Sequence, residues 1–352
     1  MATEVLKSFD ELALSSQYRF VVLLPGKTDV PKLNLKNIEI RQVGFLNGHA
    51  WEQITLPFIV KGSLLINLCG PAPILKCNQM VMIHDAAVYT NQKNFSKAFL
   101  IWYRIMFKFI KSFTKRILTV SHFSRNELIK YCRMKDSKIT VVYLGTEHIV
   151  NKESNESILD RFDLRGKKFL LAVSSKSPNK NFSAIVESLK YLQNNEQLEI
   201  VIVGMQNSQV FKTDTVSNTN NQVKFTGYIT DEELKSLYEN AACFVYPSIY
   251  EGFGLPPVEA MVCRCPVVVS YTSSLKEVCG EHAVYCDPFD PVDIANKIES
   301  VIKNTDQKTM RDNNFEHSLK YSWRKTAQDI MVQIDSMVRR SKNHEEESSV
   351  YL

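Results

Sequence analysis

Short, strongly apolar runs rich in Val, Ile and Leu recur along the chain, and segments with helical periodicity separate them. This alternation is typical of α/β domains with parallel strands. The runs are nearly continuous rather than alternately apolar and polar, which favours strands that helices cover on both faces. The predicted strands are Phe20–Leu24, Ser63–Leu68, Met80–Ile83, Ile117–Val120, Ile139–Tyr143, Phe169–Val173, Leu198–Val203, Val223–Phe225, Cys243–Tyr246 and Val267–Ser270.

The chain has 352 residues, which is enough for two such domains at roughly 100–200 residues each. We predict a doubly wound, Rossmann-like domain over residues 1–148, a polar linker over 149–165 and a second Rossmann-like domain over 166–322. A helix over residues 323–340 is expected to return to the first domain. Residues 341–352 are polar and charged, and we expect them to be a disordered tail.

The charge is unevenly distributed between the two halves. Residues 1–150 hold 20 Lys and Arg against 10 Asp and Glu, whereas the remainder holds 23 against 28. The basic first half therefore favours an anionic partner, such as nucleic acid, acidic lipid or a phosphorylated acceptor.

The eight cysteines form no C-x-x-C pair, so reduced thiols are expected rather than disulfides or a zinc site. No apolar run reaches the ~18 residues that a membrane span needs, and the first residues lack the pattern of a secretory signal. The sequence therefore predicts a cytoplasmic protein.

The most informative segment is YPSIYEGFGLPPVEAMVCRCP, residues 246–266, in which a predicted strand is followed by a glycine loop and a helix. Glycine at 252 and 254 permits a positive φ and lets a ligand approach the backbone. Two prolines follow at the start of the helix, where no N–H donor is needed. The N–H groups of Phe253, Gly254 and Leu255, together with the helix dipole, are expected to bind a diphosphate.

Two acids flank this predicted diphosphate site. Glu251 could accept hydrogen bonds from the hydroxyls of a bound sugar, and Glu259 could bind both ribose hydroxyls of a nucleotide. The purely structural alternative is an ordinary turn, with Glu259 compensating the dipole at the first turn of the helix. The combination of a strand, two glycines, two prolines and two spaced acids favours the functional interpretation.

These residues resemble the retaining glycosyltransferases of family four, whose fold is GT-B, with two Rossmann-like domains that face each other across a cleft. EGFGLPPVEAM is similar to the E-x7-E signature of that family. Further segments that resemble the family are residues 80–89, 117–128, 174–182, 225–241, 273–288 and 321–327.

The resemblance implies roles for further residues. Lys180 matches the lysine of the family that holds the diphosphate, and the alternative is a solvated surface lysine. His84 matches a histidine that lines the donor-sugar pocket, although a lone histidine is often structural. Tyr228, after a predicted strand, is expected near the base and sugar of the donor. The implied catalytic residues are thus His84, Lys180 and Glu251.

The reaction that the resemblance implies is transfer of a hexose from a nucleoside diphosphate sugar with retention of configuration. The donor could be GDP-mannose, and the acceptor a glycan or a lipid-diphosphate-linked glycan in surface polysaccharide synthesis such as that of O-antigen. The chain contains no D-x-D segment, so we expect no metal and no separate cofactor. No nucleic-acid partner is expected from this family.

Residues Leu100–Ile117 have helical periodicity, with Arg104, Lys108, Lys111 and Lys115 as a basic stripe. One interpretation is a core helix with a solvated face. The other is an interfacial helix that holds the enzyme at an anionic membrane, at the inner face of the plasma membrane.

One feature departs from the family, whose members begin with a strand and a glycine-rich loop that we do not find before Phe20–Leu24. In a doubly wound sheet that strand is central, so we expect its neighbours to be left unpaired. A truncated, non-catalytic remnant and a sugar-nucleotide epimerase of the same fold therefore remain alternatives. A nicotinamide dehydrogenase is disfavoured because no G-x-G-x-x-G follows a predicted strand.

Overall fold

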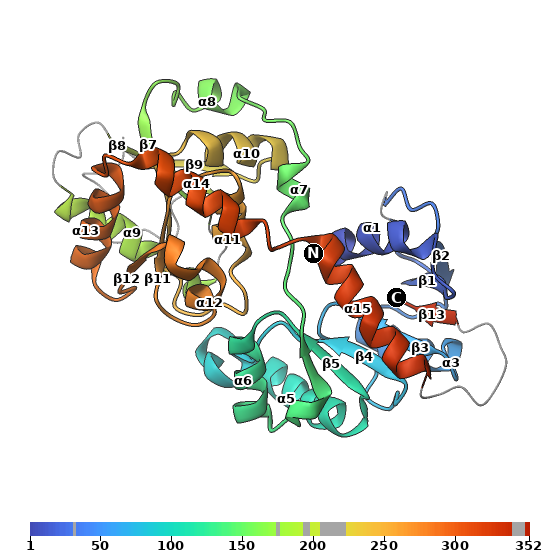
Figure 1. Cartoon of the computed structure of the whole chain (residues 1–352). Coiled ribbons are helices and arrows are strands. Elements are labelled where there is room, and N and C mark those ends of the chain that lie inside the picture. Colours follow the sequence, from blue (N-terminus) through green and yellow to red (C-terminus); the bar gives the residue numbers. More distant parts are fainter. Residues whose placement is uncertain (31–32, 174–176, 193–197, 205–222, 340–348) are drawn as a thin grey trace. The chain divides into compact units, whose positions relative to one another are not determined.

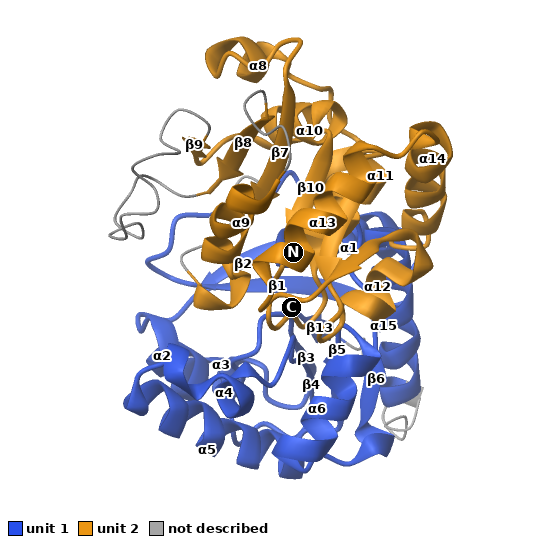
Figure 2. Ribbon diagram, turned by 90° about the vertical axis from the view of Figure 1, so that its left-hand side faces the viewer, with its two compact units in different colours: residues 1–145, 322–352 blue, residues 146–321 orange. Residues whose placement is uncertain are grey.

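The computed structural model describes all residues except 31–32, 174–176, 193–197, 205–222 and 340–348. The chain forms two compact units (Figures 1 and 2). Unit 1 contains residues 1–145 and 322–352, and unit 2 contains residues 146–321. Each unit is built on one parallel sheet with helices packed against it, so the predicted α/β class with two Rossmann-like units is confirmed.

The sheet of unit 1 has seven strands in the order β2-β1-β13-β3-β4-β5-β6, and every neighbouring pair is parallel. The strands are β1 (Arg19–Pro25), β2 (Glu39–Val43), β3 (Leu64–Asn67), β4 (Gln79–Met82), β5 (Arg116–Thr119), β6 (Ile139–Val141) and β13 (Ser349–Tyr351). The sequence patterns indicated all of them except β2 and β13. β2 was missed because EIRQV is an edge strand in which charged and polar residues interrupt the apolar ones.

Strand β13 contradicts two expectations about unit 1. Strand β13 occupies the central position and pairs with both β1 and β3. These two strands are therefore not left unpaired. The disorder expected for residues 341–352 is wrong for Ser349–Tyr351, while residues 341–348 lie outside the described part of the chain. A three-residue strand between polar segments has too little local pattern to be identified from sequence.

Two helices of unit 1 come from segments that are remote in sequence. They are α1 (Ala2–Ala13) and α15 (Trp323–Arg339), which pack against each other (Figure 1). Of the other helices, the principal ones are α5 (Lys97–Phe113) and α6 (His122–Cys132), whose N-caps are Ser96 and Ser121. The shorter helices are α2 (Gly48–Ala50), α3 (Leu56–Ile59) and α4 (Ala87–Thr90), with a π-helical turn at Trp51–Thr55 between the first two.

Unit 2 has a six-stranded parallel sheet in the order β12-β11-β10-β7-β8-β9. The strands are β7 (Lys168–Val173), β8 (Leu198–Val203), β9 (Val223–Gly227), β10 (Cys243–Tyr246), β11 (Val267–Ser270) and β12 (Val284–Cys286). Successive residues of β7 enter different apolar clusters: Phe169 and Leu171 belong to one, and Leu170 and Ala172 to the other. Both faces of this sheet are therefore covered, as the continuous apolar runs predicted.

The helices of unit 2 are α7 (Glu147–Val150), α8 (Ser157–Arg161), α9 (Phe182–Ser188), α10 (Asp231–Asn240), α11 (Leu255–Val262), α12 (Leu275–Cys279), α13 (Pro291–Ile302) and α14 (Gln307–Ser318). Residues 149–165, predicted as a linker, lie within unit 2, where α7 and α8 contact α10. Helix α10 begins with a complete capping box formed by Thr230 and Glu233. Such a box satisfies two backbone donors that the first turn would otherwise leave unpaired.

Candidate active site

The loop after β10 forms the entrance to helix α11 in unit 2. The helix begins after Gly254, whose φ is +90°. A Cβ at this position would lie 2.5 Å from Cδ2 of Leu275, so both the backbone conformation and the close neighbour require glycine. Glycine has no side chain with which to cap the helix, and Pro256 lies in the first turn. The positive end of the helix dipole is thus not capped by the N-cap side chain.

Two buried groups fix the backbone of this loop. The ring of Phe253 is 4% exposed and packs edge-on against Tyr321, with the ring centroids 5.4 Å apart. The hydroxyl of Ser274 lies 3.0 Å from the carbonyl oxygens of both Glu251 and Phe253. The N–H of Glu251 donates to the hydroxyl of Ser273 at 3.0 Å. The loop conformation is therefore established before any ligand binds.

Lys180 and Glu251, both predicted from the sequence, form an ion pair. Lys180 lies in a short 3₁₀ turn, Pro178–Lys180, that follows β7 and precedes α9. Its Nζ is 2.7 Å from Oε1 of Glu251 and also donates to the hydroxyl of Tyr246. The same carboxylate oxygen accepts hydrogen bonds from Tyr246 at 2.9 Å and from Ser248. Lys180 is therefore held by two side chains, Glu251 and Tyr246, in the loop region that leads into α11, and Ser248 holds the carboxylate.

Burial and the neighbouring carboxylate determine the state of the tyrosine in this network. Burial raises the pKa of Tyr246 well above its usual value, and the negative charge of Glu251 raises it further. Tyr246 is therefore protonated at neutral pH and can donate to Glu251. Lys180 retains partial access to solvent, with 23% of its side chain exposed. Its ammonium group can thus meet an anionic ligand.

Glu259, in the second turn of α11, is buried and accepts hydrogen bonds through both oxygens. His148, from α7, contacts Oε1 at 2.8 Å, and the Tyr238 hydroxyl donates to Oε2 at 3.0 Å. Burial raises the pKa of Tyr238 well above its usual value, so the phenol remains a donor. Only 7% of Glu259 is exposed, so any ligand hydroxyl must approach it along a narrow path or replace one of these partners.

The remaining predicted residues differ in their surroundings. Leu255 is half-buried at the first position of α11, directly beside Gly254. Tyr228 follows β9 and is 87% exposed. In unit 2 the structure therefore joins Lys180 to Glu251 and places Phe253, Gly254 and Leu255 in one turn.

His84 belongs to unit 1 and lies just after β4, as the strand pattern indicated. Its Nε2 is 3.3 Å from the carbonyl oxygen of Leu68, and its own carbonyl accepts a hydrogen bond from Ser124 at 2.8 Å. Burial lowers the pKa of His84, which favours the neutral imidazole at pH 7. Its neighbour Asp85 accepts a hydrogen bond from the N–H of Ala87, the first residue of α4, at 2.8 Å.

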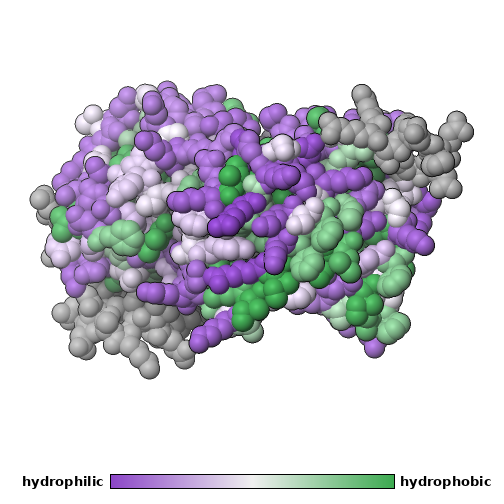
Figure 3. Space-filling view, turned by 90° about the horizontal axis from the view of Figure 1, so that it is seen from below, coloured by the Kyte–Doolittle hydropathy of each residue, from purple (hydrophilic) through white to green (hydrophobic). Residues whose placement is uncertain are grey.

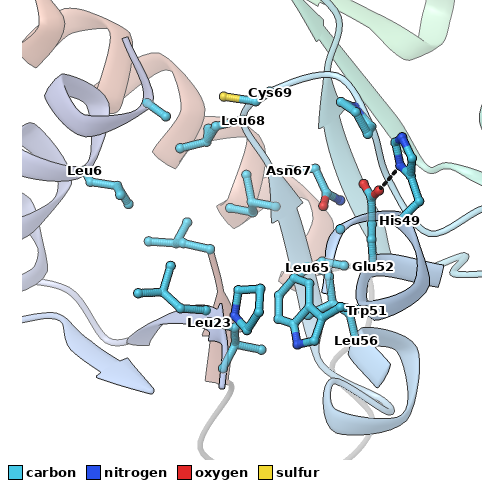
Figure 4. Close-up of a pocket in the computed structure, with 17 residues that line it drawn as sticks. Leu6, Leu23, His49, Trp51, Glu52, Leu56, Leu65, Asn67, Leu68 and Cys69 are labelled. Atoms are coloured by element: carbon cyan, nitrogen blue, oxygen red, sulfur yellow. Dashed lines mark hydrogen bonds and ion pairs between the residues drawn. The ribbon is translucent and has the colours of Figure 1, made fainter. Parts of the chain in front are cut away.

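Unit 1 contains an open cavity of about 550 Å³ at the carboxyl ends of β1 and β3 (Figure 4). Most of its lining is aliphatic or aromatic, and the labelled side chains include Leu6, Leu23, Trp51, Leu65 and Leu68. At one side Nδ1 of His49 lies 3.1 Å from Oε2 of Glu52, and burial raises the pKa of Glu52. The cavity therefore fits a largely apolar ligand with one polar end.

The structure corrects the prediction of a single basic stripe on α5. The helix ends at Phe113, so Lys115 lies beyond it and donates to Oδ1 of Asn78. Arg104 lies over the ring of Tyr89, 5.5 Å from its centroid. Lys108 is exposed, and Lys111 is partly exposed. No helix among the described residues is long and apolar enough to cross a membrane.

Residues 155–317 match the family model described as "Glycosyl transferases group 1". This match covers almost all of unit 2, including Lys180, Glu251 and Glu259. The chain is 32% identical over 184 residues to the O-antigen chain mannosyltransferase B of Escherichia coli, covering 50% of this chain and 48% of that protein. It is 29% identical over 239 residues to the O-antigen chain mannosyltransferase RfbU of Salmonella typhimurium, covering 67% of this chain and 62% of that protein. The aligned segments thus span about half to three fifths of these relatives.

Solved structures of glycosyltransferases share the fold over nearly the whole chain. A glycosyltransferase from Rickettsia africae has a TM-score of 0.72 at 16% identity, covering 97% of this chain and 95% of that one. HepE of Anabaena, solved in complex with UDP-glucose, has a TM-score of 0.70 at 16% identity, covering 90% and 99%. These likenesses show that each unit has the fold of a GT-B glycosyltransferase domain. The family match and the two O-antigen mannosyltransferase relatives support a glycosyltransferase.

Sequence reasoning missed four side chains that hold the predicted acids. Tyr246 and Ser248 lie in the motif itself, and their spacing around the end of β10 could have indicated that they point to the same side as Glu251. His148 and Tyr238 come from α7 and α10, far from Glu259 in sequence. No local pattern connects those three residues, because only the tertiary fold brings them together.

Proposed function

We propose that the protein is a retaining hexosyltransferase. In this proposal it transfers a hexose, with mannose as the leading candidate, from a nucleoside diphosphate sugar to a glycan or lipid-linked acceptor in surface polysaccharide synthesis. The observation that carries the proposal is the ion pair of Lys180 and Glu251 beside the glycine-capped start of α11. A cation and an open helix N-terminus at one place are suited to a diphosphate.

The proposed chemistry requires no nucleophile from the protein. The bond between the anomeric carbon and the diphosphate breaks while an acceptor oxygen forms a bond on the same face of the sugar. The departing diphosphate oxygen takes the proton of that acceptor hydroxyl. Lys180 and the first N–H groups of α11 stabilise the negative charge that develops on the diphosphate. Glu251 holds Lys180 in place, and its carboxylate can accept a hydroxyl of the sugar.

The proposed roles of the other predicted residues follow from their positions. Glu259 binds the ribose hydroxyls, with Tyr238 and His148 holding its carboxylate. The exposed ring of Tyr228 contacts the base or the sugar. His84, with its neutral imidazole, contacts the transferred sugar. No step uses a metal ion, so we expect EDTA to leave the rate of transfer unchanged.

Mannose and GDP are proposed because two similar proteins are named O-antigen chain mannosyltransferases. A thermal-shift panel with GDP, UDP, ADP and dTDP at equal concentrations tests the base, and GDP should give the largest increase in melting temperature. Failure of every nucleoside diphosphate to stabilise unit 2 would contradict the site. A larger shift with UDP would instead change the donor and leave the site intact.

Transfer is tested by incubating the enzyme with GDP-mannose, with and without lipid-linked glycan extracted from a surface polysaccharide producer. Release of GDP that depends on the acceptor supports a transferase. Conversion of the donor to its epimer without acceptor would identify an epimerase instead. Lys180→Ala should abolish acceptor-dependent release, whereas the exposed Lys303→Ala provides the control.

The acceptor is proposed to bind unit 1, and two features support a lipid-linked one. The apolar cavity can take an aliphatic portion of an acceptor. Helix α5 also leaves apolar side chains in solvent, with Ile101 59% and Ile105 43% exposed near the cation of Lys108. Figure 3, which draws one face of the molecule, shows hydrophobic side chains gathered beside hydrophilic ones. An amphipathic helix of this kind is suited to an anionic membrane surface on the cytoplasmic side.

Vesicle co-sedimentation tests the proposed membrane contact. Replacing Ile101 and Ile105 by Ser should reduce binding to phosphatidylglycerol vesicles at low salt several-fold, and Val332→Ser, at an exposed position of α15, is the matched control. Equal binding by all three proteins would overturn the membrane contact without affecting the donor site.

A further inference from the structure

The sheet of unit 1 is completed by a strand from a remote part of the chain. Six of its seven strands come from residues 1–145, whereas β13 comes from residues 349–351. Despite this origin, β13 occupies the central part of the sheet between β1 and β3 (Figure 1).

Both neighbours hold β13 through the backbone. Val350 lies opposite Phe20 of β1 and opposite Leu64 of β3. Beyond the strand, the N–H of Leu352 donates to the carbonyl of Val21 at 2.8 Å, and the carbonyl of Leu352 accepts from the N–H of Leu23 at 3.1 Å. The segment is therefore bound as an added strand along its whole length.

The side chains of the segment give this binding a sequence preference. Val350 is completely buried, in a layer where the adjoining residues of β1 and β3 are also buried. Tyr351 points to the other face, because side chains alternate along a strand, and it packs against the apolar cluster that contains Val21 and Leu65. A charged residue at position 350 would lose its hydration without gaining a partner.

On each side of β13, the other strands of the sheet pair with one another. Strand β1 pairs with β2 over five residues, and β3 pairs with β4, which continues through β5 to β6. Neighbouring strands are ~4.8 Å apart, so an empty position would separate β1 and β3 by roughly 10 Å. Each would then present unpaired backbone groups to the gap, as the edge of a sheet does.

We propose that the space between β1 and β3 is a strand-binding site whose ligand is an extended peptide of the form small-Val-aromatic-Leu. The occupant is the chain's own segment 349–352, bound in cis. The same peptide can replace it in trans once the connection to α15 is cut. The site thus binds by β-strand addition and selects its ligand at the buried position of Val350.

Occupancy of this site also shapes the cavity of unit 1. Leu352 contributes to the cavity lining, together with Leu23 of β1 and Leu65 of β3. When the strand leaves, one part of the wall leaves with it. A ligand that must contact this part of the cavity wall therefore binds only while β13 occupies the position between β1 and β3.

The experiment uses the full chain with a protease recognition sequence inserted between Arg339 and Ser349. The protein is folded first and cut afterwards. Native mass spectrometry then measures whether the released fragment stays bound. Fluorescence anisotropy measures binding of labelled EEESSVYL, the peptide of residues 345–352, to cut and uncut protein. Tryptophan fluorescence follows the melting of unit 1, since Trp51, Trp102 and Trp323 all belong to it.

The proposal predicts that the cut protein retains its fragment, exchanges it for the labelled peptide and binds a Val350→Asp peptide at least 30-fold more weakly. Uncut protein should not bind the peptide. If cutting releases the fragment and lowers the melting temperature of unit 1, added peptide should restore it. Loss of the fragment without a change in melting, or unfolding that the peptide does not reverse, would overturn the proposal. A dimer of the uncut protein that exchanges strands would show that the occupant comes from a second copy, which overturns binding in cis.

Discussion

The two units use the same parallel α/β architecture but differ in how their centres are assembled. In unit 2 the central strands β7 and β10 come from one continuous stretch of chain, and the loops that follow them bring together Lys180 and Glu251. In unit 1 the position between β1 and β3 is filled by β13 from beyond α15. The first assembly joins residues 71 positions apart, at Lys180 and Glu251, whereas the second joins residues 330 positions apart, at Phe20 and Val350.

The two units also differ in the polarity of the side chains around their candidate binding sites. Unit 2 concentrates hydrogen-bonded polar side chains around the start of α11, whereas the cavity of unit 1 is lined mainly by apolar side chains. This contrast suits a division in which unit 2 binds a charged donor and unit 1 an acceptor with an apolar part. Substitutions in the sheet of unit 1 should therefore mainly lower the stability of that unit. Substitutions around α11 should mainly lower donor binding or the rate of transfer.

The largest expected effect is that of a charge in the centre of the unit 1 sheet. Val350→Asp should destabilise unit 1 by more than about 3 kcal/mol, because a carboxylate would be buried without a partner. Tryptophan fluorescence during thermal melting measures this, since all three tryptophans lie in unit 1. Val332→Asp, at a position that is 61% exposed, should melt like the wild type. Equal melting of both variants would show that β13 contributes little.

The next largest effect should be confined to unit 2. Lys180→Ala should lower kcat of transfer about 100-fold or more, since a charge that stabilises the leaving diphosphate is lost. Steady-state kinetics with saturating donor measures this loss. Lys303→Ala removes an exposed, ion-paired lysine of the same unit and should retain the wild-type rate. A Lys180→Ala enzyme with wild-type kcat would exclude the proposed role.

A smaller effect is expected at the second acid. Glu259→Gln should weaken binding of the nucleoside diphosphate about 10-fold, because an ionised acceptor of the ribose hydroxyls becomes a neutral one. Isothermal titration calorimetry with GDP gives the affinity. The exposed Glu316→Gln is the control for the loss of one negative charge. Unchanged affinity in Glu259→Gln would support a purely structural role for its contacts with His148 and Tyr238.

The stability of unit 1 should also depend on pH. Burial lowers the pKa of His84, so the unfolded chain binds a proton more readily than folded unit 1. The contribution of His84 to the free energy of unfolding is fully present above the unfolded pKa of about 6.5. It is lost as the pH falls through the lower pKa of the folded protein. Denaturant titrations followed by tryptophan fluorescence at pH 7.5 and 5 measure the change. The loss should be smaller in His84→Gln, and an identical loss would assign the effect to other groups.

The smallest effect is expected at the end of α11. Arg264 has a φ of +58°, a conformation that favours glycine, yet its guanidinium forms an ion pair with Asp312 and lies 4.2 Å from the centroid of the Phe315 ring. Arg264→Gly should change the stability of unit 2 by less than about 1 kcal/mol, since relief of the backbone strain offsets the lost contacts. Calorimetric melting measures this, and a large loss would show that the contacts dominate.

Sequence patterns were sufficient for most of the fold because they are local. Runs such as Leu198–Val203 predicted the buried strands of both units. The edge strand β2 was missed because charged and polar residues interrupt its apolar ones, and β12 was missed because three residues are too few to indicate a strand. At the site, the glycine loop and its helix could be predicted together with the two acids, since all lie in a single segment. Their hydrogen-bond partners on other elements could not.

The amino-acid sequence by itself determined the α/β class and the glycine-capped start of α11, because periodicity, glycine and proline act on the neighbouring backbone. It also indicated Lys180 and Glu251 as site residues through the resemblance of their segments. Only the tertiary structure decided that Lys180 reaches Glu251, that His148 reaches Glu259 and that Val350 enters the middle of the other sheet. Those contacts join elements that are remote in sequence, so they depend on which surfaces and strand edges are still unpaired after the local elements have formed. A strand of three residues contains too little pattern to predict its position in a sheet.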